Sequence, residues 1–147
     1  MKVSTRVEYG VMALLEIAKH SENGESVSAT EIAEKQKISQ KYLEQILPQL
    51  RQAGLIKAQK GLRGGYRISK PADSIRMTEV FNALDDSILA DIETIGEPES
   101  SFRSSVNACL WGKINAKLNA FAADKTLGDL LAECSEHQAE SWDLYII

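Results

Sequence analysis

The sequence predicts a mainly α-helical fold with one small β-hairpin. Apolar residues recur at three- and four-residue spacing along most of the 147 residues, which is typical of amphipathic helices. Residues 55–69 break this pattern with two short extended runs around the glycine-rich loop KGLRGG, as in a hairpin. A hydrophobic fraction of 44% allows a modest core. A chain of this length fits one domain, or one small domain with an extension.

Three helices are expected before the hairpin. The first covers residues 4–20 and buries one face, made of Val7, Val11, Leu14, Leu15 and Ala18. A capping box of Ser28 and Glu31 begins the second helix. After a turn at residues 36–38, Ser39 caps the third helix. The buried stripe of that helix consists of Leu43, Ile46, Leu47 and Leu50.

The hairpin follows the third helix directly. Gly54 is expected to end that helix, and strands at residues 55–59 and 66–69 enclose the loop at residues 60–65. The loop glycines allow positive φ angles and give the tip little bulk. Pro48 has no N–H to donate within the third helix, so we expect the helix to kink there.

The second half of the chain is expected to be helical and acidic. A helix over residues 71–86 buries Ile75, Val80, Phe81 and Leu84. Residues 89–105 are predicted to be irregular, and Thr126 with Asp129 caps a last short helix. The apolar tail, residues 142–147, is expected to dock on some surface, because an exposed tail of this kind would be sticky.

Between these elements, a long helix is predicted at residues 106–123. Its apolar stripe has mostly four-residue spacing and consists of Val106, Leu110, Ile114, Leu118 and Phe121. So long a helix near the end of a small chain has little of its own domain to pack against, and a two-fold partner is the usual solution. The stripe therefore predicts dimerisation. Packing back onto the N-terminal part is the alternative.

Charge divides the chain into two parts. Residues 35–70 hold nine Lys or Arg and one acid, a local net charge of +8 in a chain of net charge −4. Residues 1–70 carry a net charge of +5 and residues 71–147 one of −9. A basic front half suits a polyanionic partner, although solvated charges can also cluster by chance. We expect a winged helix-turn-helix DNA-binding domain at residues 1–70, and a dimerisation and candidate sensing region at residues 71–147.

Helix, turn, helix and hairpin in this order are typical of a DNA-reading module. Polar side chains at the start of the third helix could reach base edges in the major groove, and a slim cationic tip suits the minor groove. An ordinary amphipathic surface helix is the alternative reading of the third helix. The candidate DNA-binding residues are Ser39, Gln40, Lys41, Tyr42, Glu44, Gln45, Lys60, Arg63 and Gly64.

The sequence gives little support for a nucleotide-binding protein, an enzyme, a membrane protein or a metal-binding protein. The loop GLRGG lacks the Lys-Ser/Thr of a phosphate-binding loop, and no catalytic motif is visible, so we expect no enzyme. No apolar run is long enough to span a membrane, and the N-terminus lacks a signal-peptide core, so we expect a cytoplasmic protein. Cys109 and Cys134 match no zinc spacing, and we expect no bound metal and both thiols buried on helical stripes.

Several segments together resemble the Rrf-two family of bacterial winged-helix transcription regulators, the group that contains IscR, NsrR and CymR. The resemblance covers essentially the whole chain. It is carried by STRVEYG at residues 4–10, ISQKYLEQ at 38–45, LRQAGLI at 50–56, KGLRGGY at 60–66, Leu110-Trp111 and TLGDL at 126–130. The family implies a homodimer on a palindromic operator, usually as a repressor, with the third helix in the major groove and the wing tip in the minor groove.

The resemblance also assigns roles to single residues. Glu44 matches the acid that accepts from cytosine N4, a pairing that base chemistry permits. Lys41 and Gln45 are its neighbours on the groove face, and Lys60 matches a basic wing residue. Tyr42 and the amides near Ser39 position the helix on phosphate.

One departure from the family concerns iron. Iron–sulfur members carry three closely spaced cysteines in the region that matches residues 89–105, and this chain has none there. We therefore expect no cofactor, as in the cluster-free branch to which CymR belongs. Three alternatives stay open: an iron–sulfur or thiol-responsive sensor of the same family, a regulator whose signal comes from a metabolic enzyme as partner, and a winged helix used only for protein–protein contact.

Overall fold

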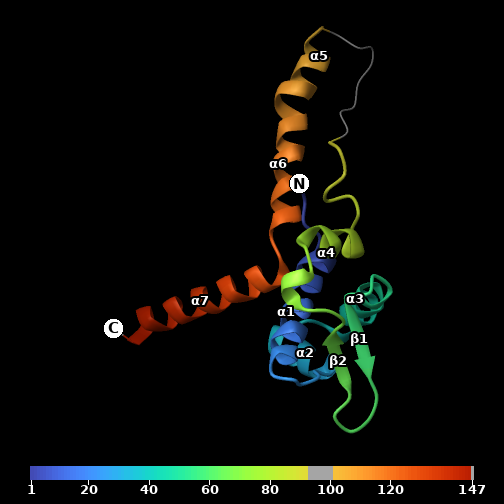
Figure 1. Cartoon of the computed structure of the whole chain (residues 1–147), viewed down its shortest axis with the longest axis vertical. Helices are drawn as coiled ribbons and strands as arrows, with labels where there is room; N and C mark the ends of the chain where they lie inside the picture. The colour runs from blue at the N-terminus through green and yellow to red at the C-terminus, as the bar shows by residue number, and fades with distance from the viewer. Residues whose placement is uncertain (93–100, 147) are drawn as a thin grey trace.

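The computed structural model describes the backbone of residues 1–92 and 101–146 (Figure 1). The first range contains α1 Thr5–Glu22, α2 Ala29–Gln36, α3 Gln40–Gln52, β1 Ile56–Gln59, β2 Gly65–Ile68, a 3-10 turn at Ala72–Ser74 and α4 Met77–Leu84. The second contains α5 Ser101–Val106, a π-helical turn at Asn107–Trp111, α6 Gly112–Asp124 and α7 Leu127–Ile146. Residues 5–84 form a body, residues 101–124 form a helical rod that rises from it, and α7 extends to one side. The predicted mainly α fold with one hairpin is confirmed.

Serine caps begin the first three helices, and those at Ser28 and Ser39 confirm the prediction. The hydroxyl oxygens of Ser4, Ser28 and Ser39 accept from the backbone N–H three residues later, at 3.3, 3.1 and 3.4 Å. Between α2 and α3, Lys37 adopts a left-handed conformation with φ 54°. This conformation reverses the chain within a few residues and so sets the angle at which α3 leaves α2.

The core of the body lies where α1 meets α2, α3, α4 and the hairpin. The four predicted α3 positions are buried, and α3 continues through Pro48 to Gln52, so the proline does not end the helix. In α1 the prediction was partly wrong, because Val11 and Leu15 are only half-buried while Ala13 and Ile17 are fully buried. Elements pack on α1 from several sides, so its buried face is wider than one stripe.

The hairpin is slightly shorter than predicted and is joined by a third short segment. Its register runs from Ile56 opposite Ile68 to Gln59 opposite Gly65. Val27, between α1 and α2, donates to the Tyr66 carbonyl at 3.1 Å and accepts from the Tyr66 N–H at 2.7 Å. These two bonds fix the base of the wing to the helix-turn-helix.

Gly65 makes this junction possible, and its replacement should be costly. Its φ is 153°, and a Cβ there would lie 2.4 Å from the Val27 carbonyl oxygen. We expect Gly65→Ala to lower the free energy of unfolding by about 1–3 kcal/mol. Gly54→Ala is the matched control, because Gly54 has φ 76° but open space around it, and should cost only about 1 kcal/mol. Urea unfolding of both variants measures the difference, and equal losses would contradict the packing argument.

The predicted helix over residues 71–86 is interrupted. Extended backbone at Ile75 and Arg76 separates the 3-10 turn from α4. The reason is a pairing with the start of α7: Met77 N–H donates to the Lys125 carbonyl at 2.9 Å, and Leu127 N–H donates to the Ile75 carbonyl at 2.8 Å. Of the four side chains predicted to be buried here, Phe81 is only half-buried.

The rod begins earlier than predicted. Residues 101–105 were expected to be irregular and are helical, while residues 93–100 of the same predicted segment lie outside the described residues. The π-helical turn continues the helix into α6. The Asn119 side-chain amide donates to the Leu89 carbonyl at 3.2 Å, and that of Asn115 donates to Asp91 at 3.2 Å. These bonds tie the lower rod to the segment that follows α4.

The last helix is long and not short as predicted. Its capping box is present: the Thr126 N–H donates to Asp129, and the Asp129 N–H donates to Thr126, both at 3.0 Å. Leu127 and Leu131 pack on the body, and Trp142, the one tail residue whose side chain is described, is 71% exposed, so the docking of the tail stays a prediction. In the described residues, no helix combines the length and apolarity needed to cross a membrane.

Candidate nucleic-acid interface

One face of α3 is polar and open to solvent. Leu43, Ile46 and Leu47 point into the core, and this leaves Gln40, Lys41, Glu44 and Gln45 exposed on the other side. Ser39 is exposed at the N-terminus of the helix, where free backbone N–H groups favour an anion. The predicted residues of this helix therefore share one accessible surface.

Tyr42 is held in place at the edge of this surface. Its ring meets Tyr9 of α1 edge to face, with centroids 5.2 Å apart and an interplanar angle of 82°. The side chain stays 37% exposed, so its hydroxyl can still reach a partner. The contact lets α1 fix an aromatic side chain beside the start of α3.

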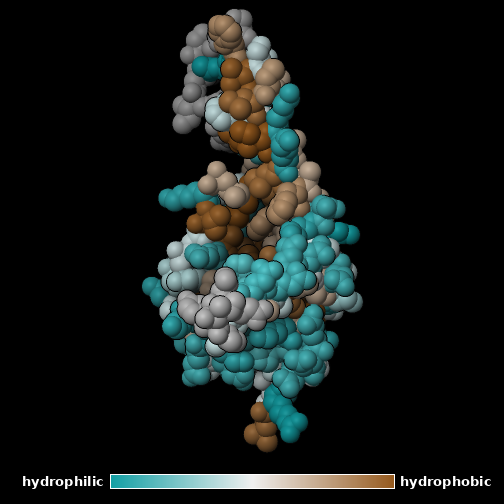
Figure 2. Space-filling model, turned by 90° about the vertical axis from the view of Figure 1, so that its left-hand side faces the viewer, coloured by the Kyte–Doolittle hydropathy of each residue, from teal (hydrophilic) through white to brown (hydrophobic). Residues whose placement is uncertain are grey.

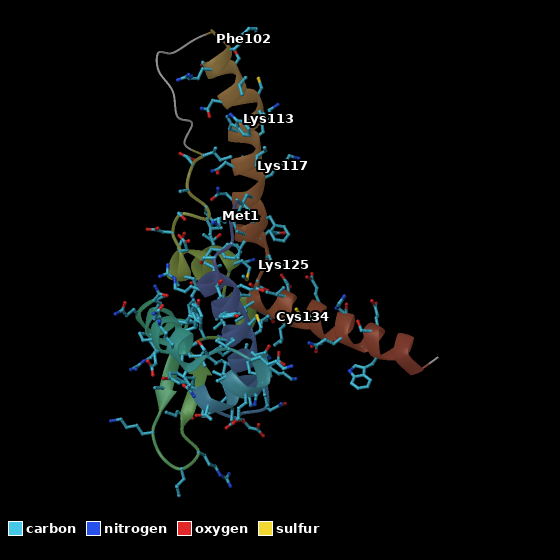
Figure 3. All side chains as sticks on the ribbon, turned by 180° about the vertical axis from the view of Figure 1, so that it is seen from behind. Met1, Phe102, Lys113, Lys117, Lys125 and Cys134 are labelled. Atoms are coloured by element: carbon cyan, nitrogen blue, oxygen red, sulfur yellow. The ribbon has the colours of Figure 1, made fainter. Side chains whose placement is uncertain are left out.

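The wing supplies a second cationic surface beside α3 (Figure 3). Lys60 and Arg63 are exposed, and neither forms an ion pair within the described part of the chain. The Gly64 N–H donates to the Gly61 carbonyl at 2.9 Å, which closes the loop. A Cβ on Gly64 would lie 2.6 Å from the Gln59 carbonyl oxygen, so this turn needs glycine. Two unpaired cations on a narrow loop can bind an anionic groove.

The tip also carries a residue that the sequence analysis did not select. Leu62 is completely exposed, at 109% of its reference area, between the two wing cations. Figure 2 shows hydrophobic surface at the lowest point of the molecule, where the hairpin ends. An apolar residue in an otherwise cationic, glycine-rich loop was the available signal.

A buried carboxylate joins the two helices that support α3. Glu16 of α1 is 6% exposed and accepts from the Gln36 amide of α2 at 2.8 Å. Lys35 and His20 lie 3.5 Å from the other carboxylate oxygen. The Lys35 ammonium and the hydrogen bond from Gln36 compensate for the burial of this group. Sequence analysis missed Glu16, because an acid on the buried side of a helix breaks the apolar pattern.

Among the described residues, three carboxyls have lowered pKa values, and these lie away from α3 and the wing tip. The Lys70 ammonium, followed by the Arg76 backbone N–H, lowers the pKa of Glu79. Hydrogen bonds from Ser87 lower the pKa of Asp85, and bonds from Thr126 lower that of Asp129. Each of these acids stabilises a turn or a helix start, so they are structural groups and do not compete for the cations of the wing.

The predicted dimerisation stripe is largely open to solvent. Val106, Leu110 and Ile114 are 38–46% exposed, Phe121 is 58% exposed, and Leu118 is half-buried. Figure 2 shows the resulting hydrophobic surface along the rod. Phe102, labelled near the end of the rod in Figure 3, extends the apolar surface and is 80% exposed. An apolar strip of this length is typical of an interface.

The chain lacks the three-cysteine set of the iron–sulfur members. Both cysteines are free, Cys109 exposed on the rod and Cys134 half-buried on α7. The expected burial of Cys109 was therefore wrong. Among the side chains that the structure describes, in residues 1–92 and 102–142, no three His, Cys, Asp or Glu are grouped as metal ligands. Cluster ligation by three thiolates is impossible with two cysteines.

Comparison with known proteins agrees with this architecture. A family model described as Rrf2, iron-dependent transcriptional regulator, matches residues 3–133. The HTH-type transcriptional regulator IscR of Cereibacter sphaeroides is 35% identical over 135 residues, which are 89% of this chain and 87% of that protein. IscR of Klebsiella pneumoniae is 36% identical over 132 residues, 89% of this chain and 80% of that protein.

Solved structures give the same result. The structure of CymR, the global cysteine regulator of B. subtilis, aligns with a TM-score of 0.77 and 31% identity, covering 90% of this chain and 98% of that one. T. potens IscR aligns with a TM-score of 0.74 and 33% identity, covering 94% and 91%. Helix-turn-helix, wing and rod are thus shared with named regulators. The chain belongs to the Rrf2 family and is a DNA-binding transcriptional regulator of the winged-helix type.

Proposed function

We propose that the protein is a homodimeric repressor that reads a palindromic operator in the cytoplasm. The observation that carries the proposal is the separation of two unpartnered surfaces: exposed polar and cationic side chains on α3 and the wing, and an exposed apolar strip on the rod. The strip on the rod would pair with its copy, and the two α3 helices would then enter half-sites about one helical turn apart.

Within each half-site, α3 and the wing have different tasks. Glu44, Lys41 and Gln45 contact base edges in the major groove, while Ser39, Gln40 and Tyr42 bind the phosphate backbone. Lys60 and Arg63 enter the minor groove, and Gly64 keeps the tip narrow. Most of the affinity comes from cations on phosphate, so binding weakens steeply with salt.

The proposal includes no cofactor. A direct test is selection of genomic fragments by the purified, metal-free protein at physiological salt, followed by sequencing, with the molar mass measured by light scattering. Recovery of one palindrome by a dimer supports the proposal. Salt-sensitive binding without sequence preference would show that a cluster, ligand or partner is required.

Base reading by Glu44 can be tested separately. Glu44→Ala should relax selectivity at one base pair per half-site, because a carboxylate acceptor for cytosine N4 is lost. The slope of log K against log salt should stay nearly unchanged, since no cation is removed. Fluorescence anisotropy with operators varied at each position measures both quantities. Glu34→Ala is a matched control, because Glu34 is an exposed acid of α2 outside the proposed contact surface. A Glu44→Ala protein with unchanged selectivity at every position would contradict the assignment.

A further inference from the structure

The most exposed large apolar side chain in the body is at the end of the wing. Leu62 projects fully from the hairpin between Lys60 and Arg63. It belongs to neither the core nor the apolar strip on the rod. Any surface that receives the two cations must therefore also receive this side chain.

The loop holds Leu62 in a defined place. The Gly64 N–H bond to the Gly61 carbonyl closes the turn around it, and Gly61 has φ 113°. At its base the hairpin is bonded to Val27, and the Ser26 hydroxyl donates to the Gln59 side chain. An apolar side chain on a supported tip keeps its position when the tip enters a groove.

The chemical groups on the floor of the minor groove differ between A·T and G·C pairs. A·T pairs present only the acceptors A N3 and T O2, while G·C pairs add the guanine N2 amino group. That amino group occupies the centre of the groove and needs a hydrogen-bond acceptor. A leucine over it would displace its water and give no acceptor in return, which is costly. A narrow A·T groove lets the same side chain pack against the sugar walls and concentrates negative potential for the flanking cations.

We propose that Leu62 is a specificity-determining residue that disfavours G·C pairs beneath the wing tip by contact with the guanine N2 amino group. This inference rests on the proposed function, because it requires the wing to enter the minor groove. It adds a source of base selectivity that is separate from α3 and acts at the outer part of each half-site.

Inosine gives a sharp test, because it has the major-groove edge of guanine but lacks the N2 amino group. In the selected operator, each A·T pair of one outer arm is replaced in turn by G·C and by I·C. The wild-type protein should bind the G·C operator on the order of tenfold more weakly than the I·C operator at one or two positions. At those positions the I·C operator should bind like the A·T operator.

Two variants assign the effect to the side chain. Leu62→Ala removes it, and Leu62→Asn has similar size but offers an acceptor to the amino group. Both should lose most of the difference between the G·C and I·C operators at the positions found, with a small remainder from the flanking cations, while Glu44→Ala should keep the full difference. Because the Leu62 side chain is fully exposed, neither variant should change the unfolding transition.

The outcomes separate this inference from the proposed function. A wild-type protein that selects no operator contradicts both. A wild-type protein that selects an operator but binds G·C and I·C equally at every position contradicts the role of Leu62 alone. A Leu62→Ala protein that keeps the full difference between G·C and I·C operators also contradicts the role of Leu62 alone.

Discussion

Ile114→Glu is expected to convert the protein from a dimer to a monomer. Ile114 lies at the middle of the strip on the rod, and its side chain is 46% exposed in the protomer. If two rods pair through this strip, the variant would bury two carboxylates without partners, which a small interface cannot compensate. Operator affinity should then fall by about 10²–10⁴-fold, because the two half-sites are no longer bound by one linked molecule.

The measurement combines light scattering with operator binding. Ala116→Glu is the matched control: it introduces the same charge two residues further on, at an exposed position on nearly the opposite side of the helix. It should remain dimeric and bind normally. A dimeric Ile114→Glu protein with full affinity would remove the strip from the interface, whereas monomers of both variants would point to a loss of the helix itself.

Removal of both wing cations should have the second largest effect. The double variant Lys60→Ala/Arg63→Ala takes away four charges per dimer, so the slope of log K against log salt should become shallower by about 3 to 4. At physiological salt, affinity should fall by at least about 2 kcal/mol. Because the lost contacts are electrostatic, the difference from wild type should shrink as salt is raised.

A salt titration of operator binding tests this expectation. Lys113→Ala/Lys117→Ala removes the same number of charges from the rod, far from the wing in Figure 3. With its dimeric state checked by light scattering, this control should keep the wild-type slope. An unchanged slope in the wing variant would mean that the wing does not approach phosphate.

The local parts of the fold could be predicted from the sequence because their causes are local. Ser28 and Ser39 mark helix starts through their own hydroxyls, and Gly54 ends α3 through its own backbone freedom. The stripe of α3 was predicted in full, since this helix has one buried side. The predicted and observed strands differ by one residue at three of their four ends.

Errors arose where distant segments decide the outcome. Extended backbone at Ile75 and Arg76 depends on residues 125–127, about 50 positions later in the chain, which no local pattern reveals. The wide buried face of α1 depends on the several elements that pack against it. Glu16 was missed for a similar reason, because its polar partners are brought together only by the fold.

The pairing of residues 75–77 with residues 125–127 also has a mechanical consequence. It fastens the junction of α6 and α7 to the segment that follows the wing, so the rod cannot pivot without breaking backbone hydrogen bonds. In the proposed dimer, the two DNA-binding domains would then be held at a fixed distance and angle to each other. Binding would therefore depend on the helical phase between the two half-sites. One base pair inserted between the half-sites would turn one domain away from its groove, even though every contacted base remained present.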